Sequence, residues 1–156
     1  MNTVILGATK GMGRALARRM AERGDRLVLL GRDLSELDKS AADLEARSPS
    51  GDRPGLALCD LEDPRTFAPA LDAAERHLGR LDTVVLTAGV FAQEDDLAGD
   101  PETVARLLTV DFTHTVFFLE QVRHRLLAQG GGTLCAFSSV SGDRGRKPAV
   151  LYGAAK

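Results

Sequence analysis

The chain has little of the material on which several classes of protein depend. Its 156 residues include no tryptophan, one tyrosine and two cysteines, and 4% are aromatic. Two isolated cysteines cannot form a disulfide framework, so we expect Cys59 and Cys135 to be buried, inert thiols in a reducing, cytoplasmic compartment rather than redox groups or metal ligands. No apolar run approaches the roughly 20 residues that span a bilayer. Because no charged segment precedes the apolar residues 2–6, a signal peptide is not indicated either.

An excess of basic charge is also absent. The net charge is −2, and the densest basic run, Arg144, Arg146 and Lys147, fits a solvated loop at least as well as a polyanion site. We therefore expect no nucleic-acid partner and no membrane contact. The three histidines show no ligand spacing to the cysteines or to one another, so we expect no metal. What the chain does contain, 44% hydrophobic and 27% charged residues, is typical of globular domains.

Apolar runs and helical spacing alternate along the chain. Short apolar runs predict strands over residues 2–6, 26–30, 55–59, 83–86 and 133–137. The segments between them predict helices over 14–23, 34–46, 64–79 and 101–129, with a further helix carrying residues 152–156. The expected buried face of the first helix comprises Ala15, Leu16, Met20 and Ala21. Asp33 followed by Glu36 predicts a capping box at the start of the second helix.

The strands are apolar throughout rather than alternating, which indicates that helices cover both faces of a parallel sheet. Right-handed crossovers then leave few topologies. We expect an α/β fold in which a Rossmann-type, doubly wound parallel sheet with strand order 3-2-1-4-5 forms the middle of three layers. Residues 1–156 show no repeat, linker or low-complexity tract, so we expect one domain.

A glycine-rich turn, Gly7-Ala8-Thr9-Lys10-Gly11-Met12-Gly13, joins the first strand to the first helix. Glycines let the backbone turn sharply and approach phosphate groups, and the helix N-terminus offers unpaired N–H groups to an anion. An ordinary connecting turn is the alternative, but the strand–turn–helix context is where such sheets bind a dinucleotide pyrophosphate. The predicted cofactor contacts in this turn are Gly7, Thr9, Lys10, Gly11, Met12 and Gly13.

The end of the second strand distinguishes the two nicotinamide cofactors. Domains that bind NAD(H) usually carry an acidic residue there for the ribose 2′-hydroxyl, whereas this chain has Gly31 followed by Arg32. The planar guanidinium of arginine suits the 2′-phosphate of NADP(H), and Lys10 can approach the same phosphate. We predict NADP(H), with NAD(H) as the less favoured reading that Asp33 supports.

The single tyrosine of the chain, Tyr152, stands four residues before Lys156. On a helix these positions share a face, so the ammonium group can stabilise the phenolate form and let the tyrosine exchange a proton with a carbonyl or an alcohol. A plain surface pair is the alternative. Ser139 follows the fifth strand, at the sheet edge where ligands of such folds bind.

Together, the glycine turn at 7–13, Thr87-Ala88-Gly89 after the fourth strand, Ser139, and the pair Tyr152 and Lys156 resemble the short-chain dehydrogenase/reductase family, over the whole chain. The resemblance implies that Tyr152 is the general acid for carbonyl reduction and the base for the reverse reaction. It also implies roles for the following residues: Lys156 at the nicotinamide ribose, Ser139 at the substrate oxygen, Asp60 and Leu61 beside the adenine, and Ala88 and Gly89 along the cofactor cleft. The alternative for Asp60 is a simple turn residue.

The sequence departs from the family pattern at two places. Where the family commonly has Asn-Asn-Ala-Gly, this chain has Leu86-Thr87-Ala88-Gly89, and Asp111 stands where the family has the asparagine of a proton relay. An ionised carboxylate accepts hydrogen bonds but does not donate them. We assign Asp111 to the relay as a fourth catalytic residue, able to hold a relay water.

The resemblance implies an NADP(H)-dependent oxidoreductase acting on a small carbonyl or alcohol substrate. The alternatives are a non-catalytic dinucleotide-binding or regulatory module and, less favoured, a nucleotide-sugar epimerase. Because the helix of Tyr152 and Lys156 would have barely one turn, we expect a fragment in which the fold is incomplete at its C-terminal end and turnover is little or none. We expect self-association through the 101–129 helix and the final helix, where Val110, Phe117 and Phe118 form either core or interface.

Overall fold

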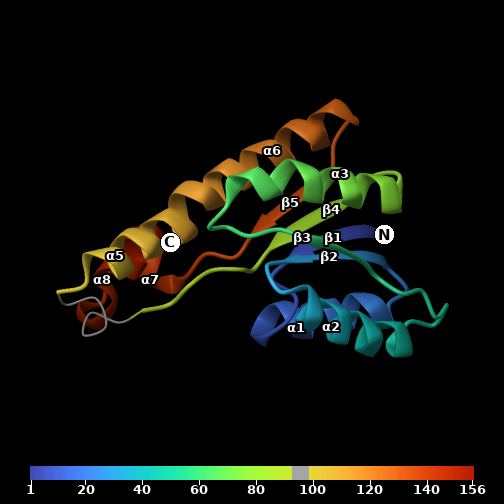
Figure 1. Cartoon of the computed structure of the whole chain (residues 1–156), viewed down its shortest axis with the longest axis horizontal. Helices are drawn as coiled ribbons and strands as arrows, with labels where there is room; N and C mark the ends of the chain where they lie inside the picture. The colour runs from blue at the N-terminus through green and yellow to red at the C-terminus, as the bar shows by residue number, and fades with distance from the viewer. Residues whose placement is uncertain (93–98) are drawn as a thin grey trace.

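A computed structural model describes residues 1–92 and 99–156 of the chain, in which strands and helices alternate (Figure 1). The strands are β1 Asn2–Leu6, β2 Arg26–Gly31, β3 Gly55–Leu58, β4 Thr83–Leu86 and β5 Thr133–Ala136. The helices are α1 Gly11–Glu22, α2 Leu34–Arg47, α3 Phe67–Leu78, α5 Pro101–Leu108, α6 Thr115–Ala128, α7 Val140–Asp143 and α8 Val150–Ala155. Further helical segments, which are not α-helical, are η1 Pro64–Thr66, η2 Thr109–His114 and η3 Lys147–Ala149. The loop expected after Gly89 lies partly outside the described residues.

The five strands form one parallel sheet in the order β3-β2-β1-β4-β5, which confirms the predicted topology. Val4 in β1 is aligned with Val28 on one side and Val84 on the other. Helices α3 and α6 cover one face of the sheet and α1 and α2 cover the other, so the fold has the three predicted layers (Figure 1). Parallel strands enter the sheet from the same end, so all their carboxyl ends meet at one edge.

Local signals set most element boundaries. The Asp33 side chain accepts the N–H of Glu36 at 3.1 Å and caps α2 as predicted. The Glu36 carboxylate instead accepts from Lys39 at 2.7 Å, because a lysine one turn along the helix offers a charged donor. Gly24 follows α1 with a φ of +84°, a backbone conformation that glycine adopts without a steric penalty.

Three of the four residues expected on the buried face of α1 are confirmed, and the fourth, Ala15, was wrong. Ala15 is exposed, whereas Ala17 and Ala21 are buried and Leu16 and Met20 pack against the same cluster. The helix begins at Gly11 rather than at residue 14. Because Gly13 packs directly against Gly7, the residues that follow it at intervals of four, Ala17 and Ala21, face the sheet. The pattern of small residues alone did not distinguish the two faces.

The predicted 101–129 helix is interrupted in its middle by a π-helical segment. Segment η2 is π-helical, and the Thr115 hydroxyl donates to the carbonyl of Val110 at 2.9 Å across the wide turn. Such insertions are frequent at functional sites. Val110 and Phe118 lie in the core, whereas Phe117 is 52% exposed, so of these three residues Phe117 alone fits the predicted interface.

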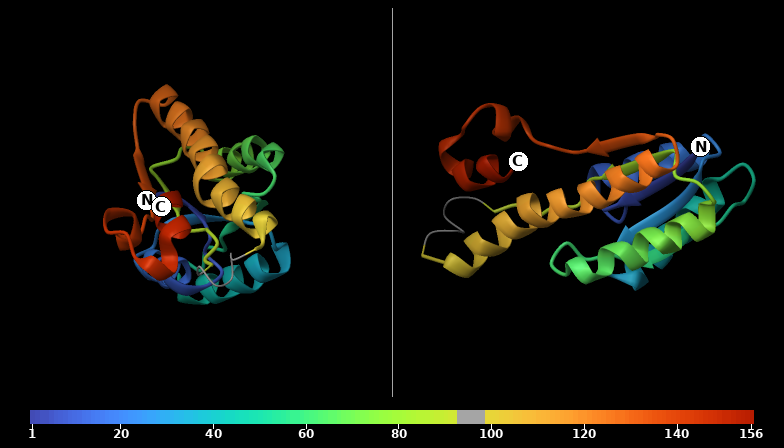
Figure 2. Two further views of the ribbon diagram at one scale, coloured as in Figure 1. Left: turned by 90° about the vertical axis from the view of Figure 1, so that its left-hand side faces the viewer. Right: turned by 90° about the horizontal axis from the view of Figure 1, so that it is seen from above.

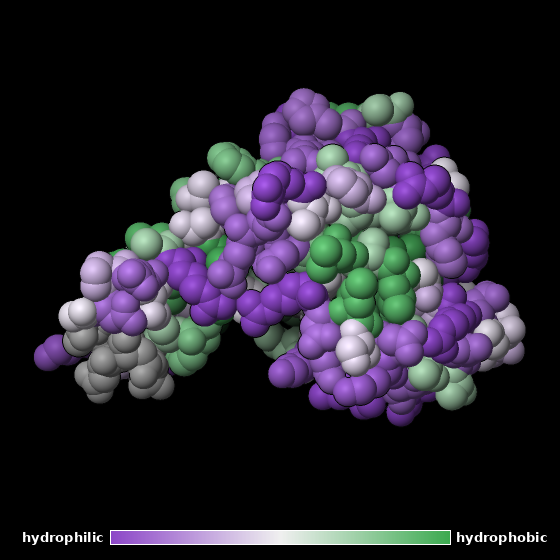
Figure 3. Space-filling model, in the orientation of Figure 1, coloured by the Kyte–Doolittle hydropathy of each residue, from purple (hydrophilic) through white to green (hydrophobic). Residues whose placement is uncertain are grey.

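The C-terminal segments lie beyond the sheet. Helices α7 and α8 pack on each other and α8 packs on α5, away from α1 and α2 (Figure 2). Strand β5 is an edge strand, and most of it is solvent-exposed. The space-filling view shows a patch of apolar residues on the surface between the two helical layers (Figure 3). No helix in the described part of the chain has the length and apolar character to span a membrane.

Candidate functional site

A cavity of about 470 Å³ opens at the carboxyl ends of β1, β2 and β4. All the residues predicted to contact the cofactor line this one cavity: Gly7, Thr9, Lys10, Gly11, Met12, Gly13, Arg32, Asp60, Leu61, Ala88 and Gly89. Their convergence follows from the topology, because each lies in a loop that leaves the same edge of the sheet. The size lies within the range of ordinary ligand sites.

The glycine turn packs closely on β1 and β4 and leaves the cavity side open. A Cβ at Gly13 would lie 2.2 Å from the carbonyl oxygen of Gly7, so a larger residue does not fit between helix α1 and the strand. A Cβ at Gly11, by contrast, would meet nothing within 4 Å, and its φ is +51°. The turn is thus tight against the protein and vacant toward the cavity, as a phosphate cradle requires.

No side-chain carboxylate of helix α1 occupies the N–H groups at its N-terminus. Its N-cap residue, Lys10, makes no side-chain capping bond, and the first turn contains no acidic residue. The backbone N–H groups of that turn, together with the helix dipole, therefore favour an external anion. These features fit the pyrophosphate of a dinucleotide.

The predicted adenine end of the cavity contains Asp60 and Leu61. The Asp60 carboxylate accepts the N–H of Glu62 at 2.9 Å, and its own N–H donates to the Thr66 hydroxyl at 2.9 Å. Asp60 thus serves the turn that was its alternative role while also facing the cavity. Leu61 is buried, and its carbonyl oxygen lies 2.5 Å from Nδ1 of His114, which attaches this loop to the long helix.

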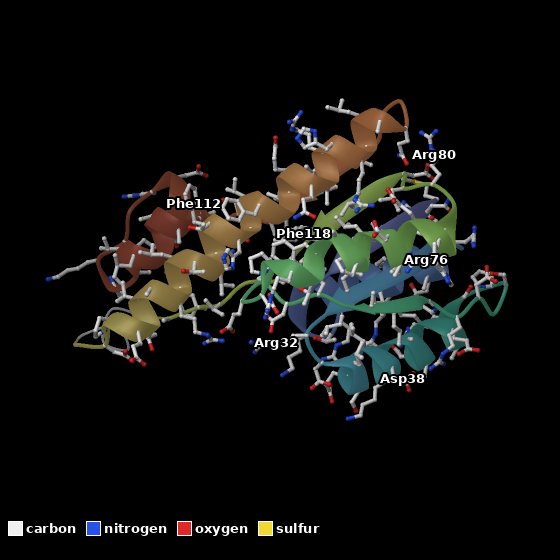
Figure 4. The ribbon with its side chains drawn as sticks, turned by 45° about the horizontal axis from the view of Figure 1, so that its top comes forward. Arg32, Asp38, Arg76, Arg80, Phe112 and Phe118 are labelled. Atoms are coloured by element: carbon white, nitrogen blue, oxygen red, sulfur yellow. The ribbon has the colours of Figure 1, made fainter. Side chains whose placement is uncertain are left out.

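Arg32 stands at the mouth of the same cavity. Figure 4 shows its side chain at the end of the sheet away from Arg76 and Arg80. Its guanidinium is 62% exposed and donates to the carboxylate of Glu62 at 3.1 Å. A solvent-facing guanidinium at the end of β2 fits the position expected for a 2′-phosphate partner.

Asp111 and Lys156 form a buried ion pair under the other end of the cavity. Lys156 Nζ lies 3.6 Å from Asp111 Oδ2, with 10% and 0% of the two side chains exposed. The N–H of Val90 donates to Asp111 Oδ1 at 2.7 Å. Burial raises the pKa of the Asp111 carboxyl above its usual value, with the Val90 N–H and the Lys156 ammonium acting against that rise.

Gly89 joins this ion pair to the cavity. A Cβ on Gly89 would lie 2.9 Å from both Lys156 Nζ and Asp111 Oδ1, so the two side chains pack directly against its backbone. Gly89 also lines the cavity. Only the backbone of Gly89 therefore separates a ligand that contacts Gly89 from the ammonium group of Lys156.

Tyr152 lies one turn before Lys156 on α8, as the spacing predicted. Lys156 Nζ is 5.8 Å from the centre of the Tyr152 ring, and the ring of Phe91 meets it edge-on at 4.9 Å between centroids. The ring is half-buried. Tyr152, Lys156 and Asp111 thus form one contiguous group.

Ser139 has a local partner. Its hydroxyl oxygen accepts the N–H of Ser141 at 3.2 Å and caps α7, a helix that the sequence did not predict. The neighbouring Ser138 hydroxyl donates to the carbonyl of Lys156 at 2.8 Å and attaches the end of β5 to α8. The structure therefore brings the serine loop to α8 through Ser138, whereas the role of Ser139 at a substrate stays a prediction.

Comparison with known proteins identifies the family. Residues 1–156 match the family described as short chain dehydrogenase. The chain belongs to the short-chain dehydrogenase family. It is 26% identical over 153 residues to Carbonyl reductase family member 4 of Xenopus tropicalis, covering 97% of this chain and 61% of that protein. It is 26% identical over 152 residues to the human 3-oxoacyl-[acyl-carrier-protein] reductase, covering 97% of this chain and 62% of that protein.

A solved structure agrees with this assignment. The structure of NAD+-bound xylitol dehydrogenase superposes with a TM-score of 0.87 and 26% identity, covering 99% of this chain and 58% of that one. The short-chain dehydrogenase chain thus spans about 60% of the length of these relatives. Membership implies a nicotinamide dinucleotide cofactor, and the open glycine turn with its uncapped helix fits that group.

Some residues of this short-chain dehydrogenase site were not among the predicted ones. Val90, Val110 and Glu62 line the cavity beside the predicted residues. Val90 contributes a backbone N–H to Asp111, which no side-chain pattern could indicate. Glu62 directly follows Asp60 and Leu61, and this adjacency in the sequence is the signal that points to it. Over residues 1–92 and 99–156, the structure contains no group of three or more His, Cys, Asp or Glu side chains arranged to hold a metal.

Proposed function

We propose that this chain carries the cofactor site and the proton-transfer residues of an NADP(H)-dependent oxidoreductase that interconverts a carbonyl and an alcohol. The observation that carries the proposal is the position of Gly89, which lines the cavity on one side and contacts Lys156 and Asp111 on the other. A dinucleotide extending from the glycine turn to Gly89 ends beside the only tyrosine–lysine pair of the chain. Two of the relatives, Carbonyl reductase family member 4 and the human 3-oxoacyl-[acyl-carrier-protein] reductase, support the same class of reaction.

The preference for NADP(H) rests on Arg32 and Lys10. Both line the cavity, and both carry the positive charge that a 2′-phosphate requires. Asp33 is the residue that favours NAD(H), but its carboxylate is engaged by the N–H of Glu36 as the cap of α2. The solved xylitol dehydrogenase is NAD+-bound, so NAD(H) is the alternative cofactor that the test has to include. The two cationic side chains at the mouth of this cavity support NADP(H).

The bound nicotinamide would supply a hydride to the carbonyl carbon or accept one from the alcohol. In the reductive direction the Tyr152 hydroxyl donates its proton to the carbonyl oxygen, and in the oxidative direction the phenolate accepts the alcohol proton. Lys156 stabilises the phenolate with its positive charge. Asp111 holds the Lys156 ammonium in place through their buried pair. The Ser139 hydroxyl donates its hydrogen to the substrate oxygen and orients it, while the hydroxyl oxygen still accepts the Ser141 N–H.

The test compares Tyr152→Phe with the unaltered protein, both made from the complete coding sequence. Titration of NADPH and NADH, followed by nicotinamide fluorescence, measures binding, and a panel of aldehydes and ketones measures turnover. We expect NADPH to bind more tightly than NADH. The substitution should lower kcat by roughly 10²–10⁴-fold, the usual contribution of a general acid, while the Kd for NADPH changes by less than about twofold.

A non-catalytic dinucleotide-binding module is the second candidate. The observation in its favour is the Asp111–Lys156 pair, because a buried carboxylate offsets the charge with which Lys156 would stabilise a phenolate. Tight NADPH binding without turnover of any carbonyl on the panel would establish this module and reject the enzyme. Self-association through the 101–129 helix and the final helix, and a cytoplasmic location, stay predictions beside either function.

A further inference from the structure

A second ionic cluster lies at the mouth of the cavity and joins Arg32 to Glu62 and Arg106, two residues without a role so far. Glu62 Oε1 accepts from Arg32 Nη1 at 3.1 Å and from Arg106 at 2.7 Å through Nη2 and 3.1 Å through Nε. The three residues come from the end of β2, the loop after β3 and helix α5. One carboxylate therefore bridges the guanidinium proposed for the 2′-phosphate to a second guanidinium on a different element.

We infer that Glu62 is a specificity-determining residue, which competes with the cofactor 2′-phosphate for Arg32 and so limits the preference for NADP(H). The inference rests on the proposed dinucleotide site and adds a residue that controls which dinucleotide it selects. Glu62 lines the same cavity as Arg32. It is the residue through which Arg106, 44 positions along the chain, becomes connected to the site.

The other carboxylates around the cavity have different partners. Asp33 caps α2, Glu36 pairs with Lys39, and Asp60 accepts the N–H of Glu62. Within the described residues, Glu62 is thus the carboxylate in contact with Arg32. The hydrogen bond from Arg106, with the charges of both arginines, holds the pKa of Glu62 below its usual value, so the carboxylate is ionised when a dinucleotide binds.

The Arg32–Glu62 pair is weak enough for the 2′-phosphate of a bound cofactor to displace the Glu62 carboxylate. Arg32 and Glu62 are 62% and 40% exposed, and exposed pairs of this kind are weak. A phosphate presents a denser negative charge and bidentate geometry to the same guanidinium. On binding, the phosphate takes Arg32 while Glu62 keeps its two bonds to Arg106. NADH carries a 2′-hydroxyl instead, so Glu62 leaves its affinity nearly unchanged.

The two partners of Arg32 should therefore act in opposite directions. Glu62→Gln keeps the side-chain shape but removes the competing charge, so NADPH should bind more tightly. Arg106→Gln removes the second cation that pairs with Glu62. The Glu62 carboxylate then interacts more strongly with Arg32, so NADPH should bind less tightly. In the double variant the effect of Arg106→Gln should shrink, because the charge that Arg106 neutralises is gone.

The experiment measures Kd for NADPH and NADH by nicotinamide fluorescence at one fixed low salt concentration, using the complete protein. Glu62→Gln should raise the ratio of the NADH Kd to the NADPH Kd by about fivefold, as expected for one unscreened charge near a surface anion. The matched control is Glu45→Gln, which breaks an exposed pair with Arg53 far from the cavity lining. That control should leave the ratio within about twofold.

The outcomes separate this inference from the proposed function. An unchanged or lowered ratio in Glu62→Gln overturns the competition, even if the unaltered protein prefers NADPH. A protein that prefers NADH, with a preference that Arg32→Gln does not alter, overturns the assignment of NADP(H). A raised ratio in Glu62→Gln supports the competition whichever cofactor the unaltered protein prefers.

Discussion

Replacing Gly13 by alanine tests how closely α1 is seated on the sheet. A Cβ at this position would lie 2.2 Å from the Gly7 carbonyl oxygen and 2.4 Å from Thr87 Oγ1, and Cβ contacts under 3.0 Å are essentially never seen in real structures. Neither neighbour can retreat easily. The N–H of Gly7 donates to the carbonyl of Leu30 at 3.2 Å, and the Thr87 hydroxyl donates to the Gly7 carbonyl at 3.0 Å. Helix α1 itself must move.

The size of the effect follows from this geometry. Overpacking a well-packed site costs about 1–3 kcal/mol, and two anchored contacts, each too short by more than half an ångström, put Gly13→Ala at about 3 kcal/mol or above. The φ of Gly13 is not positive, so close approach is the whole cause. Gly11→Ala is the matched control, because Gly11 has a φ of +51° with no atom within 4 Å of a Cβ. It should cost only about 1 kcal/mol, the penalty for left-handed backbone.

Urea unfolding followed by circular dichroism measures both variants against the unaltered protein, with the free energy of unfolding taken at equal slopes. The same samples should show that Gly13→Ala weakens NADPH binding, because the turn moves with the helix. If Gly13→Ala loses less stability than Gly11→Ala, the tight junction of α1, β1 and β4 is not what holds the glycine turn.

Three further predictions concern single side chains. Because burial raises the pKa of Asp111 above its usual 3.8, the folded protein binds this proton more tightly than the unfolded chain, and stability falls as pH rises from 3.8 through the raised value. In measurements of Tm against pH, Asp111→Asn should reduce the fall in Tm above about pH 4. Tm curves of the variant and the unaltered protein that run parallel would contradict this. Burial also raises the pKa of Cys59 to about 12, so a thiol reagent should label half-buried Cys135 first and Cys59 only after unfolding; equal labelling rates would refute this. Phe118 is fully buried and meets Phe67 edge-on at 5.5 Å, so Phe118→Ala should cost about 3–5 kcal/mol of unfolding free energy. Phe117→Ala, at an exposed position on the same helix, should cost under about 1 kcal/mol, and similar losses in the two variants would mean that their burial is misassigned.

Most of the fold was predictable because its signals are local. Apolar strands bounded by glycine turns are read directly from neighbouring residues, and the crossover rule leaves few topologies for a parallel sheet. The Asp33 cap is equally local, since it joins residues three positions apart. The π-helical segment at Thr109–His114 was not predicted, because its wide turn depends on how the long helix packs against the rest of the chain.

Within the site, sequence spacing alone determined that Tyr152 and Lys156 share a helix face and that a glycine turn opens α1, because helical geometry and backbone sterics act over a few residues. It also placed the cofactor contacts at one edge of the sheet. Only the tertiary structure decided that Asp111 meets Lys156 behind Gly89. Such contacts join segments far apart in the chain, and they depend on how helices cross the sheet, on which side chains are buried, and on which charges are thereby left facing one another.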